Sequence, residues 1–262
     1  MPKKSNLYLV GTVHTDPDGI SRLNHLLARL APKKIFLEIS EDRTNKILAT
    51  SLEDKMKKHE ETLEQWTQQG FILTPEQKSK LVDLIYFKNG SSGFEVSSSF
   101  EYKKTNPLTE IYYVDIVGEG IVEGMDEALE RSQEPTLEVR KNVLRGLEYP
   151  LENHKADLRK LVELQYKQYH EVASYAYKIS CDLDFFEREL AELSVQAKES
   201  LRRVFDPKRD EFIAKGIRKN YCAEKVSLAI MGASHLDTVA YLLTDLYPSS
   251  LLLNETSTFL NN

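Results

Sequence analysis

The sequence predicts an α/β protein with a central, mainly parallel β-sheet flanked by helices, pseudo-two-fold halves and a long helical insertion. Two segments at opposite ends of the chain, LYLVGTVH at 7–14 and SLAIMGASH at 227–235, share one design: a short apolar run that ends in Gly-x-x-His. Such runs are typical of buried parallel strands. Because ligands of open α/β sheets bind beyond the carboxyl ends of the strands, both histidines are expected at one edge.

Strands are expected over residues 7–12, 34–39, 111–116 and 226–231. Between the first two, SRLNHLLARL carries apolar residues at helical spacing and ends before Pro32, which predicts a β-α-β unit with parallel strands. The apolar stretch SSLLLNE, near the end of the chain, predicts an edge strand.

The interior of the chain is predicted to be mostly helical, within one domain over 1–262. Helices are expected over 52–69 and over 75–88, where Thr-Pro-Glu is a helix start signal. A helical insertion or arm is expected over 125–205, and part of it carries apolar residues at three- and four-residue steps. This stripe indicates either core packing or a partner helix, so a homo-oligomer through the long helices is one expectation.

Composition and charge exclude several classes of function. The 262 residues are 41% hydrophobic and 29% charged with a net charge of −6, which argues against a nucleic-acid partner because such proteins need a basic face. No apolar run approaches the ~20 residues of a membrane span, and the N-terminus has no signal-peptide pattern. Cys181 and Cys222 are not at metal-ligand spacing, and reduced thiols fit a cytoplasmic protein.

The residues that could perform chemistry follow the expected strands. His14 and His235 end the two Gly-x-x-His segments, Glu38 ends the second strand and Asp115 ends the third. Two histidines and a carboxylate are a common ligand set for a divalent metal ion with an open position for water or substrate. Asp115 is more typical of a structural role, and Glu38 has a second interpretation as a helix cap.

Two arginines and two further acids complete the candidate set. Arg43 lies one turn into the helix expected after Glu38, and Arg209 and Asp210 open a helix before the last strand. An arginine at such a site binds a carboxylate or stabilises an oxyanion, although ion pairs with nearby acids are the alternative for both arginines. Glu95 is either a binding residue or a solvated loop residue.

The chain resembles the TraB/PrgY/GumN family, which is related to the Tiki proteases and more distantly to erythromycin esterases and ChaN-like proteins. The resemblance covers about a quarter of the chain and is carried by Gly11-Thr12-Val13-His14, Glu38 with Arg43, Gly93-Phe94-Glu95, Asp115, Arg209-Asp210 and Gly232-Ala233-Ser234-His235. The family's third strand usually closes with Asp-Arg, but Ile116 follows Asp115 here. The resemblance implies pseudo-two-fold halves and a site built from His14, Glu38, Arg209 and His235.

The resemblance implies different reactions in different relatives: metal-dependent peptidase activity with manganese or cobalt, lactone hydrolysis with a histidine base, or haem binding without catalysis. The leading hypothesis is a metal-dependent hydrolase of peptides or small esters. In it His14, His235 and Glu38 hold a divalent ion (Mn, Co, Zn or Fe), Glu38 alternatively acts as general base, and Arg209 stabilises the oxyanion. The competing hypothesis is a non-catalytic protein that binds a peptide or haem at the same site. No Gly-x-Ser-x-Gly elbow is present, which argues against a serine hydrolase.

Overall fold

Five parallel strands form the central sheet in the order β3-β2-β4-β1-β5. They are β1 (Leu7–Thr12), β2 (Lys34–Leu37), β3 (Glu110–Tyr113), β4 (Ser227–Gly232) and β5 (Ser249–Leu252). This computed structural model describes residues 6–51, 72–89, 93–115, 151–180 and 207–256, together with some residues between 53 and 68. The sheet confirms the predicted α/β class.

The strand predictions differ from the structure mainly at the strand ends. β2 stops at Leu37 rather than at residue 39, so Glu38 lies just beyond the strand, and β3 stops at Tyr113, two residues before Asp115. β5 is an edge strand, as predicted, although it ends at Leu252. β1 and β4 are almost wholly buried, as expected for parallel strands covered on both faces.

The two Gly-x-x-His strands are neighbours at the centre of the sheet. β1 pairs with β4 over six residues, and Thr12 lies opposite Gly232. The connection from β1 through α1 (Gly19–Leu30) to β2 passes over β4, and the connection from β4 through α12 (Leu236–Leu242) to β5 passes over β1. These crossovers run in opposite directions along the sheet, which is the arrangement that pseudo-two-fold halves require.

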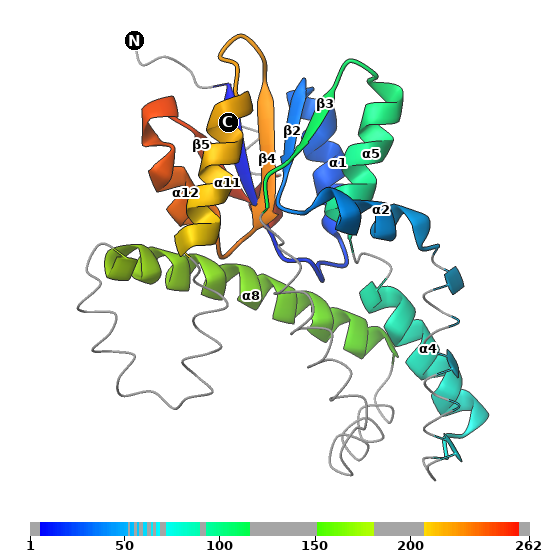
Figure 1. The fold of residues 1–262 in the computed structure, drawn as a ribbon. Coiled ribbons are helices and arrows are strands. Elements are labelled where there is room, and N and C mark those ends of the chain that lie inside the picture. The colour runs from blue at the N-terminus through cyan, green and yellow to red at the C-terminus, as the bar shows by residue number, and fades with distance from the viewer. Residues whose placement is uncertain are drawn as a thin grey trace.

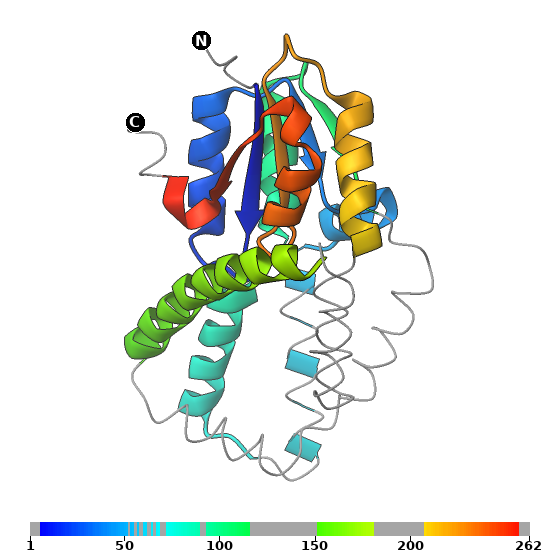
Figure 2. The same ribbon diagram turned by 90° about the vertical axis from the view of Figure 1, so that its left-hand side faces the viewer.

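Helices cover both faces of the sheet. α1 and α5 (Phe94–Thr105) pack together on one face, and α11 (Pro207–Asn220) and α12 lie on the other (Figures 1 and 2). Gly216 lets α11 approach the sheet closely, because a Cβ at this position would lie 2.9 Å from Cγ1 of Val114. This contact places Gly216 of α11 next to Val114, the residue that follows β3.

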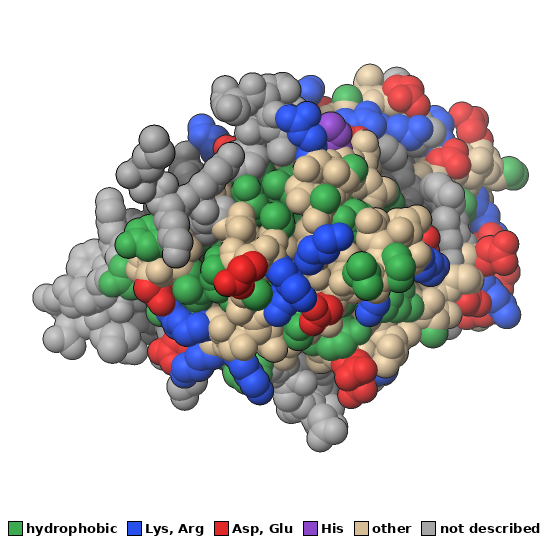
Figure 3. All heavy atoms as spheres, turned by 90° about the horizontal axis from the view of Figure 1, so that it is seen from above, with side chains coloured by type: hydrophobic (Ala, Val, Ile, Leu, Met, Phe, Trp, Pro, Cys, Tyr) green, Lys and Arg blue, Asp and Glu red, His purple; other side chains and the backbone are tan. Residues whose placement is uncertain are grey.

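The remaining helices lie at or near the carboxyl ends of the strands. α8 (Leu151–Ser180) runs across this end of the sheet, and α4 (Pro75–Asn89) contacts it (Figure 1). α2 (Glu41–Ala49) follows β2, and two short 3₁₀ turns, Thr244–Leu246 and Leu253–Glu255, flank β5. The opposite end of the molecule, seen from above, carries interspersed acidic and basic side chains (Figure 3).

Part of the predicted helical interior can be compared with the structure. Val162 and Tyr166 of the apolar stripe are buried, whereas Leu161 is half exposed. Of the insertion expected over 125–205, residues 151–180 form α8, and residues 125–150 and 181–205 lie outside the described residues. No helix among the described residues is long and apolar enough to cross a membrane.

Candidate functional site

Three of the predicted site residues converge on Gly232, the last residue of β4. A Cβ built on Gly232 would lie 3.6 Å from Oε2 of Glu38, 3.6 Å from Cδ2 of His235 and 3.7 Å from Nε2 of His14. The side chains come from the ends of three strands that are adjacent in the sheet, β2, β4 and β1. A glycine therefore leaves a gap of about one methyl group between two imidazoles and a carboxylate.

His14 is oriented by a carboxylate from α5. Its Nδ1 lies 2.7 Å from Oε1 of Glu95, and the hydroxyl of Thr12 donates to the same oxygen over 2.9 Å. Since an ionised carboxylate only accepts hydrogen bonds, the imidazole proton belongs on Nδ1, and Nε2 on the Gly232 side carries the lone pair in the neutral ring. The His14 side chain is 67% exposed, and its hydrogen bond with Glu95 raises its pKa above 6.5.

His235 has a different environment, because both of its ring nitrogens face carboxylates. Nδ1 lies 2.5 Å from Oδ1 of Asp210, and Nε2 lies 3.3 Å from Oε1 of Glu38. The ring is buried, which opposes the charged form, but the two carboxylates outweigh this effect and raise the pKa of His235 above 6.5. His235 is therefore a buried histidine that bridges two carboxylates, whereas His14 is the accessible histidine.

Glu38 and Asp115 are paired with the same arginine. Arg209 donates from Nε and Nη2 to the two oxygens of Asp115 over 2.9 and 2.8 Å, and its Nη2 also lies 2.5 Å from Oε1 of Glu38. The second oxygen of Glu38 accepts the N–H of Gly232 over 2.6 Å. Both acid side chains are nearly inaccessible, so Arg209 belongs to a buried ion-pair network and is not a surface salt bridge.

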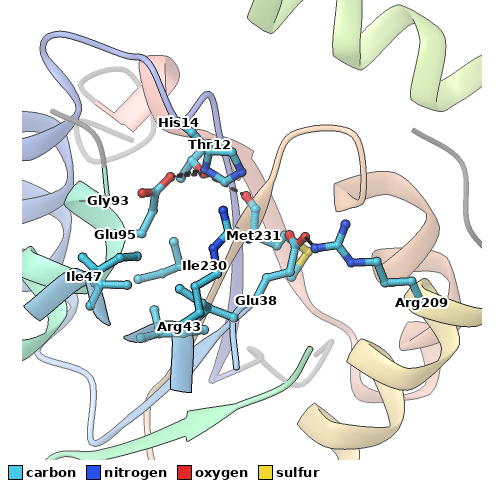
Figure 4. Close-up of a pocket in the computed structure, with 13 residues that line it drawn as sticks. Thr12, His14, Glu38, Arg43, Ile47, Gly93, Glu95, Arg209, Ile230 and Met231 are labelled. Carbon is cyan, nitrogen blue, oxygen red and sulfur yellow. Dashed lines mark hydrogen bonds and ion pairs between the residues drawn. The ribbon is translucent and has the colours of Figure 1, made fainter. Parts of the chain in front are cut away.

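A pocket of about 160 Å³ opens beside this network. Arg43 reaches from α2 into the pocket toward His14, between Glu95 and Glu38 (Figure 4). Ser40 caps α2 by accepting the N–H of Arg43, so the alternative of Glu38 as the cap is wrong. Glu95 is buried in the first turn of α5, so its alternative as a solvated loop residue is wrong as well.

The loop that carries His14 is fixed by α8. The N–H of Val13 donates to the hydroxyl of Tyr166, which donates to Asp16 over 2.9 Å. Asp16 also accepts from Arg22, whose second nitrogen donates to Glu163 of α8. Burial, together with Asp16, raises the pKa of Tyr166, so its hydroxyl keeps its proton at all ordinary pH values. This network holds the backbone immediately before His14 in one position.

The donor set for a metal ion is not free in this arrangement. Glu38 is committed to Arg209 and to the Gly232 amide, and His235 faces carboxylates with both nitrogens. Over the described ranges, no group of three or more His, Cys, Asp or Glu side chains is placed to hold a metal. The predicted ligands His14, His235 and Glu38 lie together but do not fit a metal ion as arranged, so no catalytic step is assigned to one. Metal binding stays a prediction.

Sequence reasoning did not single out three contributors to this site. Thr12 supports Glu95, Tyr166 fixes the His14 loop, and Gly232 leaves the central gap. Both Gly232 and Thr12 belong to the Gly-x-x-His motifs, which could have indicated them: Gly232 is the glycine of the second motif, and Thr12 directly follows the glycine of the first. Tyr166 had none, because its apolar spacing is that of an ordinary core position on a helix.

The pKa of His235 can be measured directly, and we expect it to exceed 6.5. The pKa of His235 is higher in the folded than in the unfolded chain. The stabilisation by His235 is therefore complete at pH values below its pKa in the unfolded chain, and it is lost as the pH rises through its pKa in the folded chain. Asp210→Asn should lower the pKa, because it removes one of the two facing carboxylates. An NMR titration of the His235 Cε1 proton tests this, and a midpoint at or below 6.5 in the unmodified chain would contradict the assignment.

Comparisons of this chain with protein-family models, with curated proteins and with solved structures find no match. The function is therefore inferred from the geometry of the site.

Proposed function

We propose that this chain hydrolyses a carbonyl compound, an ester or an amide, with His14 as general base. The observation that carries the proposal is the pairing of an accessible histidine with a buried carboxylate at Nδ1, which leaves Nε2 directed at the gap above Gly232. A base held in this way by a carboxylate is a recurring device of hydrolases. The gap lies next to a pocket with a cationic side chain, Arg43.

The reaction balances with water as the only co-reactant. Nε2 of His14 takes a proton from water while the water oxygen bonds to the carbonyl carbon, and the carbonyl oxygen becomes an oxyanion. The C–O or C–N bond to the leaving group then breaks, and the leaving group takes the proton from His14. Glu95 stabilises the imidazolium that exists between the two steps, and Arg43 stabilises the oxyanion.

Oxyanion stabilisation by Arg43 replaces the role first expected for Arg209. The charge of Arg209 is balanced by Glu38 and Asp115, so it has little potential left for a third anion. Its role is to hold Glu38, which in turn holds the Gly232 amide at the floor of the site. The ion pairs of Arg209, together with those of His235 and Asp210, hold the side of the site opposite His14 in a fixed position. Preorganised catalysis requires such fixed positions.

A metal-dependent hydrolase of the TraB/Tiki type is the second candidate, and one observation favours it. Both histidines are held at Nδ1 by carboxylates, as histidine ligands of metal ions commonly are. His14 and His235 would hold such an ion only if His235 gave up the proton that faces Glu38, so metal content before and after the His235→Ala substitution separates the candidates.

A Gly232→Ala variant tests where the reaction takes place. The added methyl group would meet Glu38, His235 and His14 at ordinary contact distances of 3.6–3.7 Å, so the free energy of unfolding should change by less than about 1 kcal/mol. The methyl group would, however, occupy the gap that the attacking water needs. We therefore expect turnover of the best ester or amide substrate to fall by about 10²-fold or more.

Ser227→Ala, at the other end of the same strand, is the matched control and should leave turnover unchanged. Chemical denaturation of both variants, alongside initial rates, separates loss of activity from loss of fold. A stable Gly232→Ala protein with full turnover would show that the reaction takes place elsewhere. If the unmodified chain turned over no substrate, the predicted alternative of a non-catalytic binding protein would gain support.

A further inference from the structure

We infer that the pocket beside His14 binds the acyl half of the substrate, that this half is a short uncharged aliphatic acyl group, and that Arg43 holds the carboxylate product. The inference rests on the proposed hydrolysis and names its substrate class. Its first support is the charge of Arg43. Within the described part of the chain, no carboxylate lies within ion-pair distance of Arg43, although the pocket it enters is lined by two acids, Glu38 and Glu95. The other arginine of the lining, Arg209, is already paired with Glu38 and Asp115.

Four other arginines of the described residues are paired with carboxylates. Arg22, Arg159 and Arg218 each have a carboxylate oxygen within 3.2 Å, as Arg209 does. Their charges are therefore balanced within the fold. The guanidinium of Arg43 instead points toward His14, in the position where negative charge develops in the proposed reaction (Figure 4). An arginine with this freedom is suited to an anion that arrives with the ligand.

The two glutamates of the pocket favour a singly charged anion over a doubly charged one. Glu95 is bonded to His14 and Thr12, and Glu38 is bonded to Arg209 and Gly232, so neither neutralises Arg43 by direct contact. Both nevertheless keep negative charge near the ligand. A planar carboxylate with one charge matches the guanidinium fork in two parallel hydrogen bonds, whereas a phosphate dianion would be repelled more strongly by the two glutamates.

The walls and the size of the pocket define the rest of the ligand. Apart from the charged groups, Thr12 and Gly93, the lining is aliphatic: Leu37, Ile39, Ile47, Val96, Ile230 and Met231. Its volume of about 160 Å³ is close to the ~150 Å³ of an engineered apolar cavity that takes benzene. The pocket therefore has room for about six heavy atoms, which corresponds to a short or branched aliphatic acyl group.

Substrate and product then use the same contacts in sequence. The neutral acyl group enters the aliphatic pocket with its carbonyl oxygen beside Arg43, and the attack of water turns this oxygen into the oxyanion. When the bond to the leaving group breaks, the acyl carbon retains the water oxygen as a carboxylic acid. This acid releases its remaining proton to solvent and becomes a carboxylate at the same position. Arg43 thus binds the product more strongly than the neutral substrate, so short carboxylates should inhibit the reaction.

A binding experiment that needs no turnover tests this inference. Isovalerate, hexanoate, isovaleramide and inorganic phosphate are titrated into the chain by calorimetry, with Arg43→Gln as the test variant and Arg218→Gln as the control with an exposed arginine. We expect the carboxylates to bind the unmodified chain and the Arg218→Gln variant, and to bind Arg43→Gln about 10- to 100-fold more weakly. Isovaleramide and phosphate should bind more weakly than isovalerate.

Four results would each overturn the inference. They are equal affinity for isovalerate and isovaleramide, equal affinity of the Arg43→Gln variant and the unmodified chain for the carboxylates, higher affinity for phosphate than for isovalerate, and no carboxylate binding to the unmodified chain. The outcome is distinguishable from failure of the proposed function. Carboxylate binding that depends on Arg43, without hydrolysis of any isovaleryl or hexanoyl ester or amide, would support the carboxylate site and reject the hydrolase. Turnover without carboxylate binding would reject the site and leave the hydrolase standing.

Discussion

A His14→Asn variant is expected to lose about 10²- to 10⁴-fold in turnover, the usual contribution of a positioned general base. Asparagine keeps a donor at the position of Nδ1, so the contact with Glu95 can remain while the basic Nε2 is lost. Because the His14 side chain is largely exposed, the free energy of unfolding should change by no more than about 1 kcal/mol. Initial rates and chemical denaturation measure the two effects separately.

The pH dependence of turnover gives an independent readout of the same residue. The neutral imidazole is the active form, so turnover should rise with pH through a pKa above 6.5. Glu95→Gln should move this rise to lower pH, because the hydrogen bond that raises the pKa is weakened. His25→Asn, an exposed histidine on α1, is the matched control and should leave turnover and its pH dependence unchanged. Full activity of His14→Asn would contradict its role as base.

Replacing Arg209 with methionine is expected to destabilise the fold by about 3–5 kcal/mol, since it leaves two buried carboxylates without their shared cation. The side chains of Glu38 and Asp115 are only 4% and 2% exposed, so water cannot replace the lost ion pairs. Urea or guanidinium denaturation followed by circular dichroism measures the loss.

A matched control lies on the same helix. Lys215 forms an exposed ion pair with Glu211, and Lys215→Met should change the free energy of unfolding by less than about 0.5 kcal/mol. Adding Asp115→Asn to the Arg209→Met variant should recover part of the lost stability, because one uncompensated charge is removed. Equal unfolding midpoints for Arg209→Met and Lys215→Met would contradict the buried network.

The parallel sheet and its two Gly-x-x-His strands could be predicted because buried parallel strands leave a strong local signal of short apolar runs. The same signal could not show that these two strands are neighbours in register, since their pairing depends on crossovers from distant helices. The apolar runs also did not indicate the exact ends of β2 and β3. Strand ends depend on the ladder with the partner strand, which a short apolar run does not specify.

At the site, the residue types could be predicted but their partners could not. Alternation along a strand places Glu38 near the carboxyl end, but nothing local indicates that Arg209, far away in the chain, pairs with it. The two histidines have the same motif, and only the packing of α5 and α11 shows that His14 has one carboxylate partner and His235 has two. Their different roles are therefore a tertiary property.

The most direct test of the central claim is a set of initial rates with isovaleryl and hexanoyl esters of p-nitrophenol and with the corresponding anilides. We expect hydrolysis by the unmodified and His25→Asn proteins, and loss of hydrolysis in His14→Asn and Gly232→Ala proteins that remain folded. Absence of hydrolysis by the unmodified chain, or full rates in His14→Asn, would contradict a histidine-based hydrolase at Gly232.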